Sequence, residues 1–524
     1  RHHFYSISIQ IIFITVSHWE SRCVCDIIRY QTTGIIIIII FYFLYSSSKA
    51  SEIVSVMLSV ISIVVAVLIA SKQENEALCL LWIMCILAFP VFGGLMYLMF
   101  HFQSSTKSFR KMSNTIENDT RPLFFMSESS MENALSDYPE QTTAIKYLEK
   151  SAGFPIYANT QTKYLSPGEV KFEYMLEELK KAEHYIFMEY FIIQEGIMWN
   201  SILDILKEKA EKGVDVRLLY DDIGCFLTLP KDFPEQMRKL GIKCCVFNSF
   251  RPFLVSEQNN RDHRKIAVID GKVAFTGGIN LADEYINAYE KYGHWKDASV
   301  MVRGDAAWSF TVFFLQMWAL CTKEAEDFAK FYPWKNEKCD ISGDGYIQPY
   351  SDSPLDSENV GEHVYLQIID GAKKYLYINT PYLIINESLV TALTLAAKSG
   401  VDVRIVTPYK WDKLIVHITT QSYYRELIRA GVQIYEYSSG FIHSKTFVSD
   451  DAVATVGTTN LDFRSLYMHF ECGIRISGGT VISEIKKDFL NTLESCKKIT
   501  EEDCKCNFFV GLLQKIFRIF APMM

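Results

Sequence analysis

The octet HRKIAVID, at residues 263–270, returns as HSKTFVSD at residues 443–450. Both copies place a histidine, a lysine and an aspartate at the same spacing, and in both an apolar strand ends in a turn. A bend of small residues then follows at the same distance, VAFTGGIN at 273–280 and VATVGTTN at 453–460. Two copies at matching places predict a duplicated fold and one site built from two half-sites.

The duplication extends over most of the chain. Residues 181–224 align with residues 371–412, and both segments have the pattern of a strand, a helix and a second strand. β-Branched runs such as VDVRLLY and VDVRIV are typical of strands buried within a sheet. The sequence therefore predicts an α/β fold of two homologous α/β/α halves, 152–335 and 336–505, related by a pseudo-twofold axis.

Composition limits the classes of protein that fit. The chain has 524 residues, 49% of them hydrophobic, and a formal net charge of −8. It is long enough for two or more folded units, and its apolar content excludes a disordered chain. An acidic balance disfavours a nucleic-acid partner, which is usually bound by basic proteins. The 13 cysteines include no CxxC pair and no zinc-ligand spacing, so we expect free thiols and a reducing compartment for the soluble part.

Residues 51–101 carry the pattern of a membrane anchor. The segments 53–71 and 78–100 are uncharged, and each has about the 20 residues that a helix needs to cross a bilayer. Basic residues follow the second segment, in HFQSSTKSFRKM, whereas the loop between the segments holds two glutamates and one lysine. This asymmetry predicts a multi-pass protein of the cell membrane with a cytoplasmic catalytic region. Buried core helices are less favoured, because soluble helices of this length usually carry a polar face.

Three other segments have less distinct patterns. Residues 1–50 contain the run IIIIII and no methionine, so we expect a doubtful N-terminal extension. Residues 102–151 are polar and lack periodicity, which predicts a linker. Residues 506–524 place phenylalanines and leucines at helical spacing. This amphipathic tail fits two alternatives equally, a place on anionic lipid or packing against the second half.

The octets indicate a particular chemistry. Residues two apart on a strand project from the same face, so the histidine and lysine of each octet point together. Two facing halves would bring four side chains to one anionic ligand: His263, Lys265, His443 and Lys445. Asn280 and Asn460 follow in bends where an amide can approach phosphate oxygens. This set suits a phosphodiester, since one histidine can attack phosphorus while the other protonates the leaving alcohol, with neither a metal nor a cofactor.

The aspartates that end the octets have two interpretations. Asp270 precedes a glycine and Asp450 precedes an aspartate, and both dipeptides are good turn sequences. Each aspartate is therefore favoured as a turn former over a catalyst, and it is equally open whether it also orients a histidine or holds a structural charge pair. The sequence leaves these possibilities open.

The residues around the octets resemble the phospholipase D superfamily and, within it, the bacterial cardiolipin synthases. The octets match the paired HxKxxxxD signature of the superfamily. Their flanks are similar to the synthase versions, NNRDHRKIAVIDGKVAFTGGINLADEY at 259–285 and GFIHSKTFVSDDAVATVGTTNLDFRS with the following HFE at 440–471. The resemblance begins with the two apolar segments, includes TPYLI at 380–384 and extends to the C-terminus.

The resemblance implies a membrane-bound phosphatidyltransferase. One phosphatidylglycerol would donate its phosphatidyl group through a phosphatidyl-histidine, a second would accept it through a glycerol hydroxyl, and glycerol would leave. Carried over by position, the catalytic residues are His263, Lys265, Asp270, His443, Lys445 and Asp450, and the phosphate ligands are Asn280 and Asn460. His263 is our choice of nucleophile. Glu284 and Glu471, which follow the two motifs, are expected to support one histidine each.

This chain departs from the family pattern at two places. It has Trp295-Lys296-Asp297 where Trp-Arg-Asp is usual, and His469 where an asparagine commonly precedes Phe-Glu. Lysine keeps the charge of arginine but loses its bidentate fork, so that contact is expected to weaken. We expect both changes to affect peripheral contacts, and His469 and His294 to be packed or surface histidines.

The implied partners are phosphatidylglycerol, other anionic phospholipids and the bilayer, with no nucleic acid, and the oligomeric state stays open. Several alternatives compete with the synthase. The site could pass the phosphatidyl group to water, as a phospholipase D does, or serve a phosphatidylserine synthase or a nuclease. The apolar segments and the synthase-like flanks disfavour the last two. A membrane scaffold with a dead site is disfavoured because both octets are intact.

Overall fold

The computed structural model describes residues 49–71, 76–90, 93–94, 97–98, 104–250, 256–335 and 338–524. The N-terminal extension expected at 1–50 lies almost wholly outside these residues. The chain divides into two compact units, a smaller one of residues 1–74, 82–103 and 250–258 and a larger one of residues 75–81, 104–249 and 259–524. Both octets belong to the larger unit.

The smaller unit contains the helix α3 (Lys49–Ala70) and most of α4 (Glu76–Ala88). α4 ends shortly before Pro90, because a proline disfavours helical backbone at the residue before it. Among the residues that the structure describes, no helix is both long and apolar enough to cross a membrane. The spans expected at 53–71 and 78–100 therefore stay a prediction, and part of the second lies outside the described residues.

The first half of the larger unit is built on a seven-stranded sheet with the order β1-β9-β7-β6-β2-β3-β4. The neighbouring strands β2, β3 and β4 are parallel, and β2 is buried at every residue, as its continuous apolar pattern predicts. The strands are β1 (Thr160–Leu165), β2 (Tyr185–Tyr190), β3 (Asp215–Asp221), β4 (Lys243–Phe247), β6 (Ile266–Ile269), β7 (Val273–Gly277) and β9 (Ser299–Gly304).

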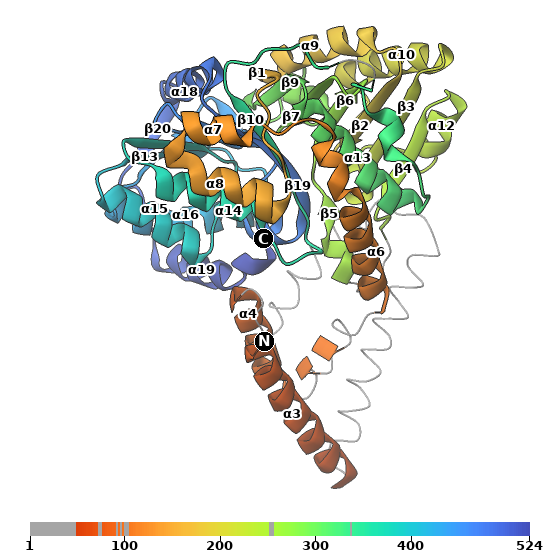
Figure 1. The fold of residues 1–524 in the computed structure, drawn as a ribbon. Helices are drawn as coiled ribbons and strands as arrows, with labels where there is room; N and C mark the ends of the chain where they lie inside the picture. Colours follow the sequence, from red (N-terminus) through yellow and green to blue (C-terminus); the bar gives the residue numbers. More distant parts are fainter. Residues whose placement is uncertain are drawn as a thin grey trace. The chain divides into compact units, whose positions relative to one another are not determined.

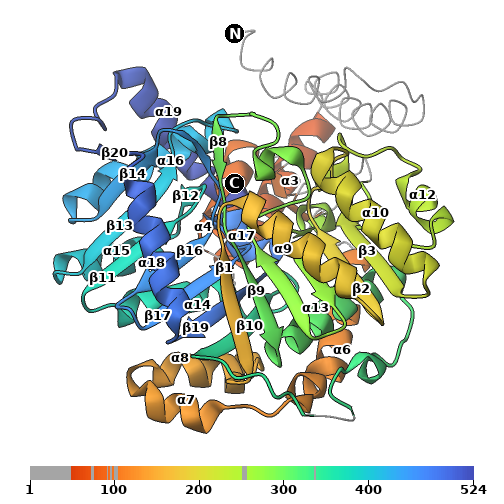
Figure 2. The ribbon, with the colours of Figure 1, turned by 90° about the horizontal axis from the view of Figure 1, so that it is seen from above.

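The second half repeats this sheet. Its order is β10-β19-β17-β16-β11-β13-β14, with β20 added at the edge, and β11, β13 and β14 are again parallel. Figures 1 and 2 show the two sheets next to each other in the larger unit. The prediction of two homologous α/β halves is confirmed. The strands are β10 (Tyr346–Asp352), β11 (Tyr375–Asn379), β13 (Asp402–Pro408), β14 (Gln433–Tyr437), β16 (Thr446–Ser449), β17 (Val453–Gly457), β19 (His469–Ser477) and β20 (Cys496–Ile499).

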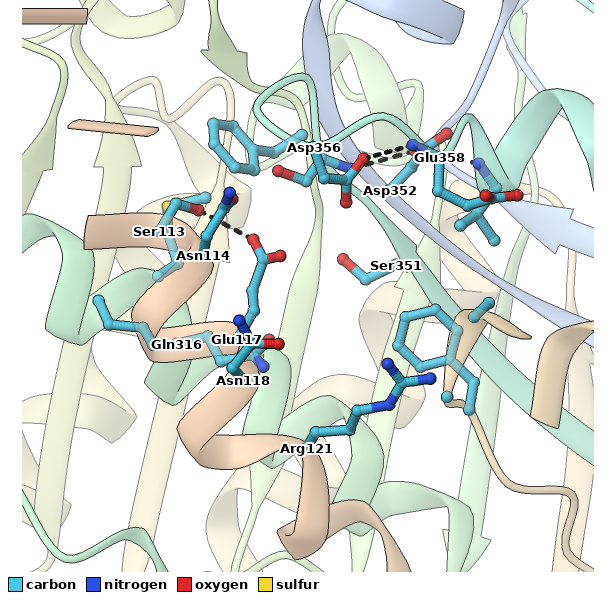
Figure 3. A pocket seen from close by; sticks show the side chains of 18 of the residues that line it. Ser113, Asn114, Glu117, Asn118, Arg121, Gln316, Ser351, Asp352, Asp356 and Glu358 are labelled. Carbon is cyan, nitrogen blue, oxygen red and sulfur yellow. Dashed lines mark hydrogen bonds between the residues drawn. The ribbon is translucent and has the colours of Figure 1, made fainter. Parts of the chain in front are cut away.

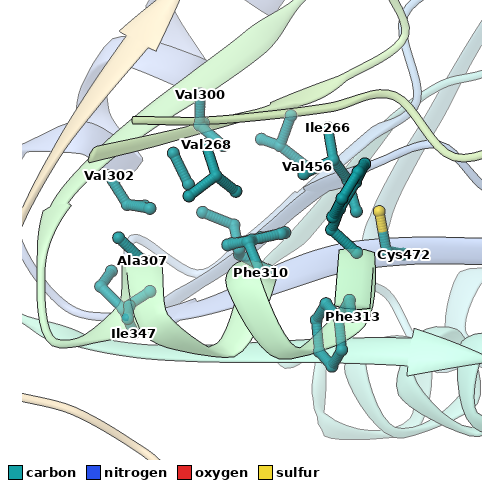
Figure 4. Close-up of a cluster of buried hydrophobic side chains, with 14 of the residues drawn as sticks. Ile266, Val268, Val300, Val302, Ala307, Phe310, Phe313, Ile347, Val456 and Cys472 are labelled. Carbon is teal, nitrogen blue, oxygen red and sulfur yellow. The ribbon is translucent and has the colours of Figure 1, made fainter. Parts of the chain in front are cut away.

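A buried helix joins the two halves into one core. α13 (Ala306–Thr322) is buried at nearly every position, because almost all of its residues are apolar. Its Phe310 and Phe313 belong to one apolar cluster with Val268 of the first sheet and Ile347 of the second (Figure 4). Close packing of this kind resists relative movement, so the two octets keep a fixed mutual position.

The other helices of the halves surround the sheets. The first half has α9 (Gly168–Lys181), α10 (Ile197–Glu211), α11 (Asp222–Cys225) and α12 (Phe233–Lys239). The second has α14 (Val360–Gly371), α15 (Glu387–Lys398), α16 (Leu414–Arg429), α17 (Phe463–Tyr467) and α18 (Thr480–Leu493). α19 (Phe508–Ile519) and the short helix η7 (Ala521–Met523) end the chain.

Residues 104–152 differ from the linker that the sequence predicts. They form α6 (Ser104–Thr120), η1 (Arg121–Met126), α7 (Met131–Asp137), η2 (Pro139–Gln141), α8 (Thr142–Lys146) and η3 (Tyr147–Ala152). Phe124, Ile145 and Leu148 are buried, and Nε1 of Trp308 donates to the carbonyl of Leu123 at 2.7 Å. A few isolated apolar residues in a polar segment can each be buried without giving the sequence a helical period. The sequence therefore predicted a linker in place of these helices.

One pair of cysteines also differs from expectation. Cys245 on β4 and Cys321 on α13 form a disulfide, with their Cα atoms 6.7 Å apart. The two residues are 76 positions apart in sequence, so spacing could not reveal a contact made only where α13 packs on the sheet. The other cysteines of the described residues are free thiols.

Candidate active site

Each octet is preceded by a short strand that pairs with the opposite half. β5 (Arg261–Asp262), directly before the first octet, runs parallel to the start of β19 in the second half. β15 (Gly440–Ile442), directly before the second octet, runs parallel to β8 (His294–Lys296) in the first half. Two equivalent strand pairs therefore hold the histidines of the octets at the boundary between the halves.

Glu471 contacts the histidine of the first octet although it lies in the second half. The backbone N–H of His263 donates to the carbonyl of Phe470 at 3.0 Å, which places the next side chain beside the imidazole. Nδ1 of His263 lies 2.9 Å from Oε1 of Glu471, and the Thr458 hydroxyl donates to Oε2. A carboxylate at Nδ1 orients the ring and leaves Nε2 for the substrate.

Asp297 contacts the histidine of the second octet in the same way. The backbone N–H of His443 donates to the carbonyl of Lys296 at 2.7 Å, and its Nδ1 lies 2.8 Å from Oδ2 of the next residue, Asp297. Asp297 is therefore the structural counterpart of Glu471. The carboxylates cross the boundary between the halves in opposite directions.

The expected partner of Glu471 in the repeat was Glu284, and the structure corrects this pairing. Glu284 forms an ion pair with Lys291 at 2.8 Å and not with a histidine. The sequence did contain the correct signal, because the segment DASVMVR at 297–303 aligns with the segment ECGIRIS at 471–477. Asp297 lies two residues before Ser299, which pairs with Gly277, and Glu471 lies two residues before Gly473, which pairs with Gly457.

The two lysines are buried beside the histidines. Lys265 is 0% exposed and Lys445 is 1% exposed. Each ammonium group donates to the carbonyl of the histidine two residues earlier. Burial lowers the pKa of Lys265 to about 8 and that of Lys445 to about 7, because the charged forms lose water. An anionic ligand would favour the charged forms, so the pair is suited to binding phosphate.

Both imidazoles are neutral in the ligand-free site. Burial and the adjacent Lys445 lower the pKa of His443 to about 4. Burial, together with Lys265 and the cationic groups of the opposite half, holds the pKa of His263 well below its usual value. Burial raises the pKa of Glu471 to about 8. At Asp297 burial acts in the same direction, but His443 and Lys445 outweigh it and lower the pKa.

The two asparagines are buried near the octets but differ in their contacts. Oδ1 of Asn280 accepts from the backbone N–H of Ile192 at 3.1 Å, and its Nδ2 donates to the hydroxyl of Tyr285 at 2.8 Å. Oδ1 of Asn460 is buried and has no hydrogen-bond partner in the described part of the chain. Binding of phosphate by these amides stays a prediction.

The aspartates of the octets contact backbone and not the histidines. The carboxylate of Asp270 accepts from the backbone N–H groups of residues 183–185 at 2.7 to 2.8 Å. Asp450 accepts from residues 373–375 at 2.6 to 2.9 Å. Each lies five residues beyond its lysine along a strand, a distance of about 16 Å. Both have a positive φ, 51° and 57°, which aspartate tolerates in turns.

His469, expected to be a packed or surface residue, is packed and lies beside His263 and Glu471. Its ring centroid lies 5.5 Å from that of His263, and its Nδ1 lies 3.8 Å from Oε1 of Glu471. The three side chains offer ligand atoms within 4.8 Å of one another, a spacing that could hold a metal. However, Nε of Arg464 donates to Nε2 of His469 at 3.3 Å, which places the ring proton on Nδ1. That nitrogen faces Glu471 from 3.8 Å without a hydrogen bond in the described part of the chain.

Sequence analysis missed a buried charge network behind the first octet. Nε of Arg264 donates to Oε1 of Glu189 at 2.6 Å, and its Nη1 donates to Ser351 in the second half at 3.2 Å. The backbone N–H of Asp262 donates to Asp221 at 3.0 Å. Burial raises the pKa of Glu189 and of Asp262, and the nearby guanidinium of Arg264 offsets this only in part.

A polar cavity of ≈ 310 Å³ lies beside Arg264, between α6 and the segment after β10 (Figure 3). Glu117 of α6 faces this cavity and accepts a hydrogen bond from Ser113 at 2.9 Å. Burial raises the pKa of Glu117, and raises that of Asp356 to about 7. No histidine or lysine of the octets lines the cavity, so it is separate from the candidate site.

Comparison with known proteins agrees with this site. A sequence family described as cardiolipin synthase, PLD-like domain, matches the chain twice, at residues 175–308 and 365–493. Each match contains one octet. The crystal structure of phosphatidylserine synthase from Haemophilus influenzae aligns with a TM-score of 0.55 and 15% identity, over 70% of this chain and 95% of that one. The shared fold and paired motifs define a member of the phospholipase D superfamily.

Relatives aligned over most of the chain narrow the class. A cardiolipin synthase of Alkalihalophilus pseudofirmus is 34% identical over 475 residues, 90% of this chain and 93% of the relative. One of Geobacillus kaustophilus is 33% identical over 480 residues, with the same coverage of 90% and 93%. An uncharacterized protein of Streptococcus mutans is 41% identical over 461 residues, 87% of this chain and 98% of the relative. The chain belongs to the cardiolipin synthases and is an enzyme of the phospholipase D type.

Proposed function

We propose that this enzyme transfers the phosphatidyl group of one phosphatidylglycerol to a glycerol hydroxyl of a second, giving cardiolipin and glycerol through a phosphatidyl-histidine. Family membership gives the synthesis of cardiolipin. The main support for a two-step mechanism is the crossed pairing, in which Glu471 contacts one histidine and Asp297 contacts the other. Each imidazole has its Nδ1 occupied and its Nε2 available, as a nucleophile and a general acid require.

His263 is the better nucleophile of the two. The carboxylate of Glu471 accepts the proton on its Nδ1, so Nε2 keeps the lone pair. Nδ1 of His443 lies within hydrogen-bond distance of both Asp297 and the ammonium of Lys445, at 2.8 and 2.9 Å. The pKa of Asp297 is lowered, so its carboxylate can hold a charged imidazolium at Nδ1, and Nε2 of His443 then carries the proton that a leaving alcohol needs.

The two steps balance in atoms and protons. Nε2 of His263 forms a bond to phosphorus as the bond to the glycerol headgroup breaks, and His443 protonates the departing oxygen. The bound phosphate offsets the lysine charges that lower the pKa of His443, which allows protonation in the complex. His443 then takes the proton from the hydroxyl of the second lipid, whose oxygen attacks phosphorus and releases His263.

Lys265 and Lys445 bind the non-bridging phosphate oxygens in this proposal, with the amides of Asn280 and Asn460 as further donors. Asp270 and Asp450 act on the fold and not on the substrate, since their carboxylates are occupied by backbone N–H groups. The substrate lipids lie in a bilayer. We propose that residues 53–71 and 78–100 anchor the enzyme there, with the catalytic halves on the cytoplasmic side.

Incubation of the full chain in vesicles with phosphatidylglycerol labelled in the headgroup glycerol tests the proposal. We expect equal amounts of cardiolipin and free glycerol, and neither product from His263→Ala or His443→Ala. Glu284→Gln is the matched control, because that carboxylate pairs with Lys291 outside the site. Phosphatidate in place of cardiolipin would make the enzyme a hydrolase.

Acid quenching during turnover, followed by peptide mass spectrometry, tests the order of the histidines. We expect the phosphatidyl adduct on the peptide that contains His263. An adduct on the His443 peptide would reverse the two roles, and the absence of any adduct at short times would favour direct transfer between lipids.

A further inference from the structure

The C-terminal helix α19 has an apolar face that no part of the described protein covers. None of its residues is buried. Phe508 and Phe509 are 78% and 74% exposed. Leu512, Leu513 and Ile516 follow at helical spacing and are also exposed, so the apolar residues form one continuous stripe. A stripe of this kind in water is unfavourable unless something covers it.

The charges of the tail are of one sign. Residues 504–524 contain two lysines, one arginine and no aspartate or glutamate. Arg518 donates to Glu426 on α16 at 2.7 Å and lies over the ring of Tyr423, with 4.4 Å to its centroid. This contact holds α19 along α16 (Figure 1), so the apolar stripe stays on the outside.

The end of the chain is anchored beside the active site. Ala521 and Pro522 are buried, and the carbonyl of Met524 accepts from the backbone N–H of Arg464 at 2.9 Å. Arg464 in turn donates to His469, the residue two before Glu471. α19 is thus attached to the second half through Arg518 and through the residues that follow the helix, and its exposure is not that of a frayed terminus.

We propose that the apolar stripe of α19, Phe508, Phe509, Leu512, Leu513 and Ile516, docks on the surface of an anionic phospholipid bilayer. This inference rests on the proposed function for the presence of lipid substrate. A bilayer is complementary to the stripe in both properties, since its interface takes up apolar side chains and its negative headgroups attract the neighbouring lysines. Docking here would hold the second half of the enzyme against the layer that contains its substrate.

A second copy of the chain is the weaker occupant. A stable protein interface buries about 800 Å² on each partner. A helix of 12 residues is only about 18 Å long and offers less than that area on one face. A bilayer needs no further contact surface, because the polar side of the helix remains on the protein.

Photo-crosslinking of the full chain in phosphatidylglycerol-containing membranes tests the inference without requiring turnover. Benzoylphenylalanine replaces Phe509 in one variant and Leu395 in the control. Leu395 is 61% exposed on α15 and has no exposed large apolar neighbour on that helix. After irradiation, mass spectrometry separates adducts to lipid, to a second chain and to the same chain.

We expect lipid adducts at position 509, at least about tenfold more abundant than at position 395, because a docked aromatic side chain lies among acyl chains and headgroups. Adducts to a second chain would replace the bilayer by a dimer interface. Adducts within the same chain would show that the stripe is covered internally. Either result overturns the proposal. Lipid adducts in a preparation that makes no cardiolipin would contradict the proposed function alone.

Discussion

Oε1 of Glu471 lies 2.9 Å from Nδ1 of His263, and the two residues belong to opposite halves of the chain. Asp297 and His443 make the reverse contact at 2.8 Å. Neither half therefore contains a complete histidine-carboxylate pair. The duplication supplies two half-sites, and the parallel pairs β5-β19 and β8-β15 bring each carboxylate to the histidine of the other half.

Glu471→Gln and Asp297→Asn should each reduce the rate of cardiolipin formation by between about 10²- and about 10⁴-fold, the upper figure being the cost of an amide behind a catalytic histidine in serine proteases. The amide cannot accept the Nδ1 proton and stabilise a charged imidazole at the same time. Steady-state kinetics on phosphatidylglycerol vesicles measures the loss. Glu284→Gln should retain most activity, and a loss at Glu284 as large as at Asp297 would contradict the crossed arrangement.

The pH dependence of kcat/KM should show a narrow maximum between about pH 7 and pH 8. On the acid side Glu471, whose pKa burial raises to about 8, must lose its proton to hold the Nδ1 proton of His263. On the alkaline side the lysines lose charge, because burial lowers the pKa of Lys445 to about 7 and that of Lys265 to about 8. The observed limbs belong to the coupled group as a whole.

Lys445→Arg tests whether the lysines cause the alkaline limb of the pH profile of kcat/KM. Arginine stays charged throughout this range, so the alkaline limb should move upward, toward the pKa of about 8 of the remaining Lys265. The acid limb should stay in place. The same substitution will lower the maximum rate, since a guanidinium differs in shape from an ammonium. An alkaline limb that does not move would assign it to another group.

Asp270→Ala should lower stability and leave the specific activity of the folded enzyme nearly unchanged. The substitution removes the acceptor of three backbone N–H groups and should cost about 1–3 kcal/mol. Thermal unfolding in detergent, with activity measured well below the transition, separates the two effects. Asp270→Asn is the milder control, because asparagine also tolerates positive φ and keeps one acceptor oxygen. A large loss of activity at unchanged stability would restore a catalytic role.

Much of the fold could be predicted from the sequence because it is a repeat. A shared strand-helix-strand pattern at two places specifies a shared sheet order, and the sheets have that order. The buried helices of residues 104–152 could not be predicted, since their few apolar side chains gain meaning only where α13 and the second sheet receive them. Contacts of this kind depend on the assembled core and not on local periodicity.

The same distinction applies to the candidate site: local spacing predicts some of its residues, and contacts between the halves determine the others. The histidines and lysines were predictable because the spacing of two residues sets their direction on an extended chain. Asp297 received no role in the sequence analysis, although its place in the repeat matches Glu471. The network of Glu189 and Arg264 has no counterpart in the second octet, where Ser444 stands in place of the arginine. An asymmetric feature cannot be found by comparing the halves.

Lys171 offers a test of the buried electrostatics. It lies on α9 with no exposed surface, and its Nζ donates to the carbonyl of Ile279, next to Asn280, at 3.0 Å. Burial lowers its pKa to about 7, although nearby Asp297 opposes the shift. An unfolded lysine titrates near about 10.4. Between these values the unfolded chain binds a proton that the folded chain does not, so this residue's contribution to the free energy of unfolding rises with pH.

The penalty for burying Lys171 is therefore fully present below about pH 7 and is relieved as the pH rises toward about 10. The wild-type protein should therefore gain stability relative to Lys171→Met over this interval. The Tm of the wild type minus the Tm of Lys171→Met should increase with pH. Thermal unfolding of both proteins at pH 7, 8 and 9 measures the difference. Lys212→Met, at an exposed lysine paired with Glu208, should show no such trend. If the Lys171→Met difference were equally flat, Lys171 would have to be charged in the folded protein and paired more closely than its contacts indicate.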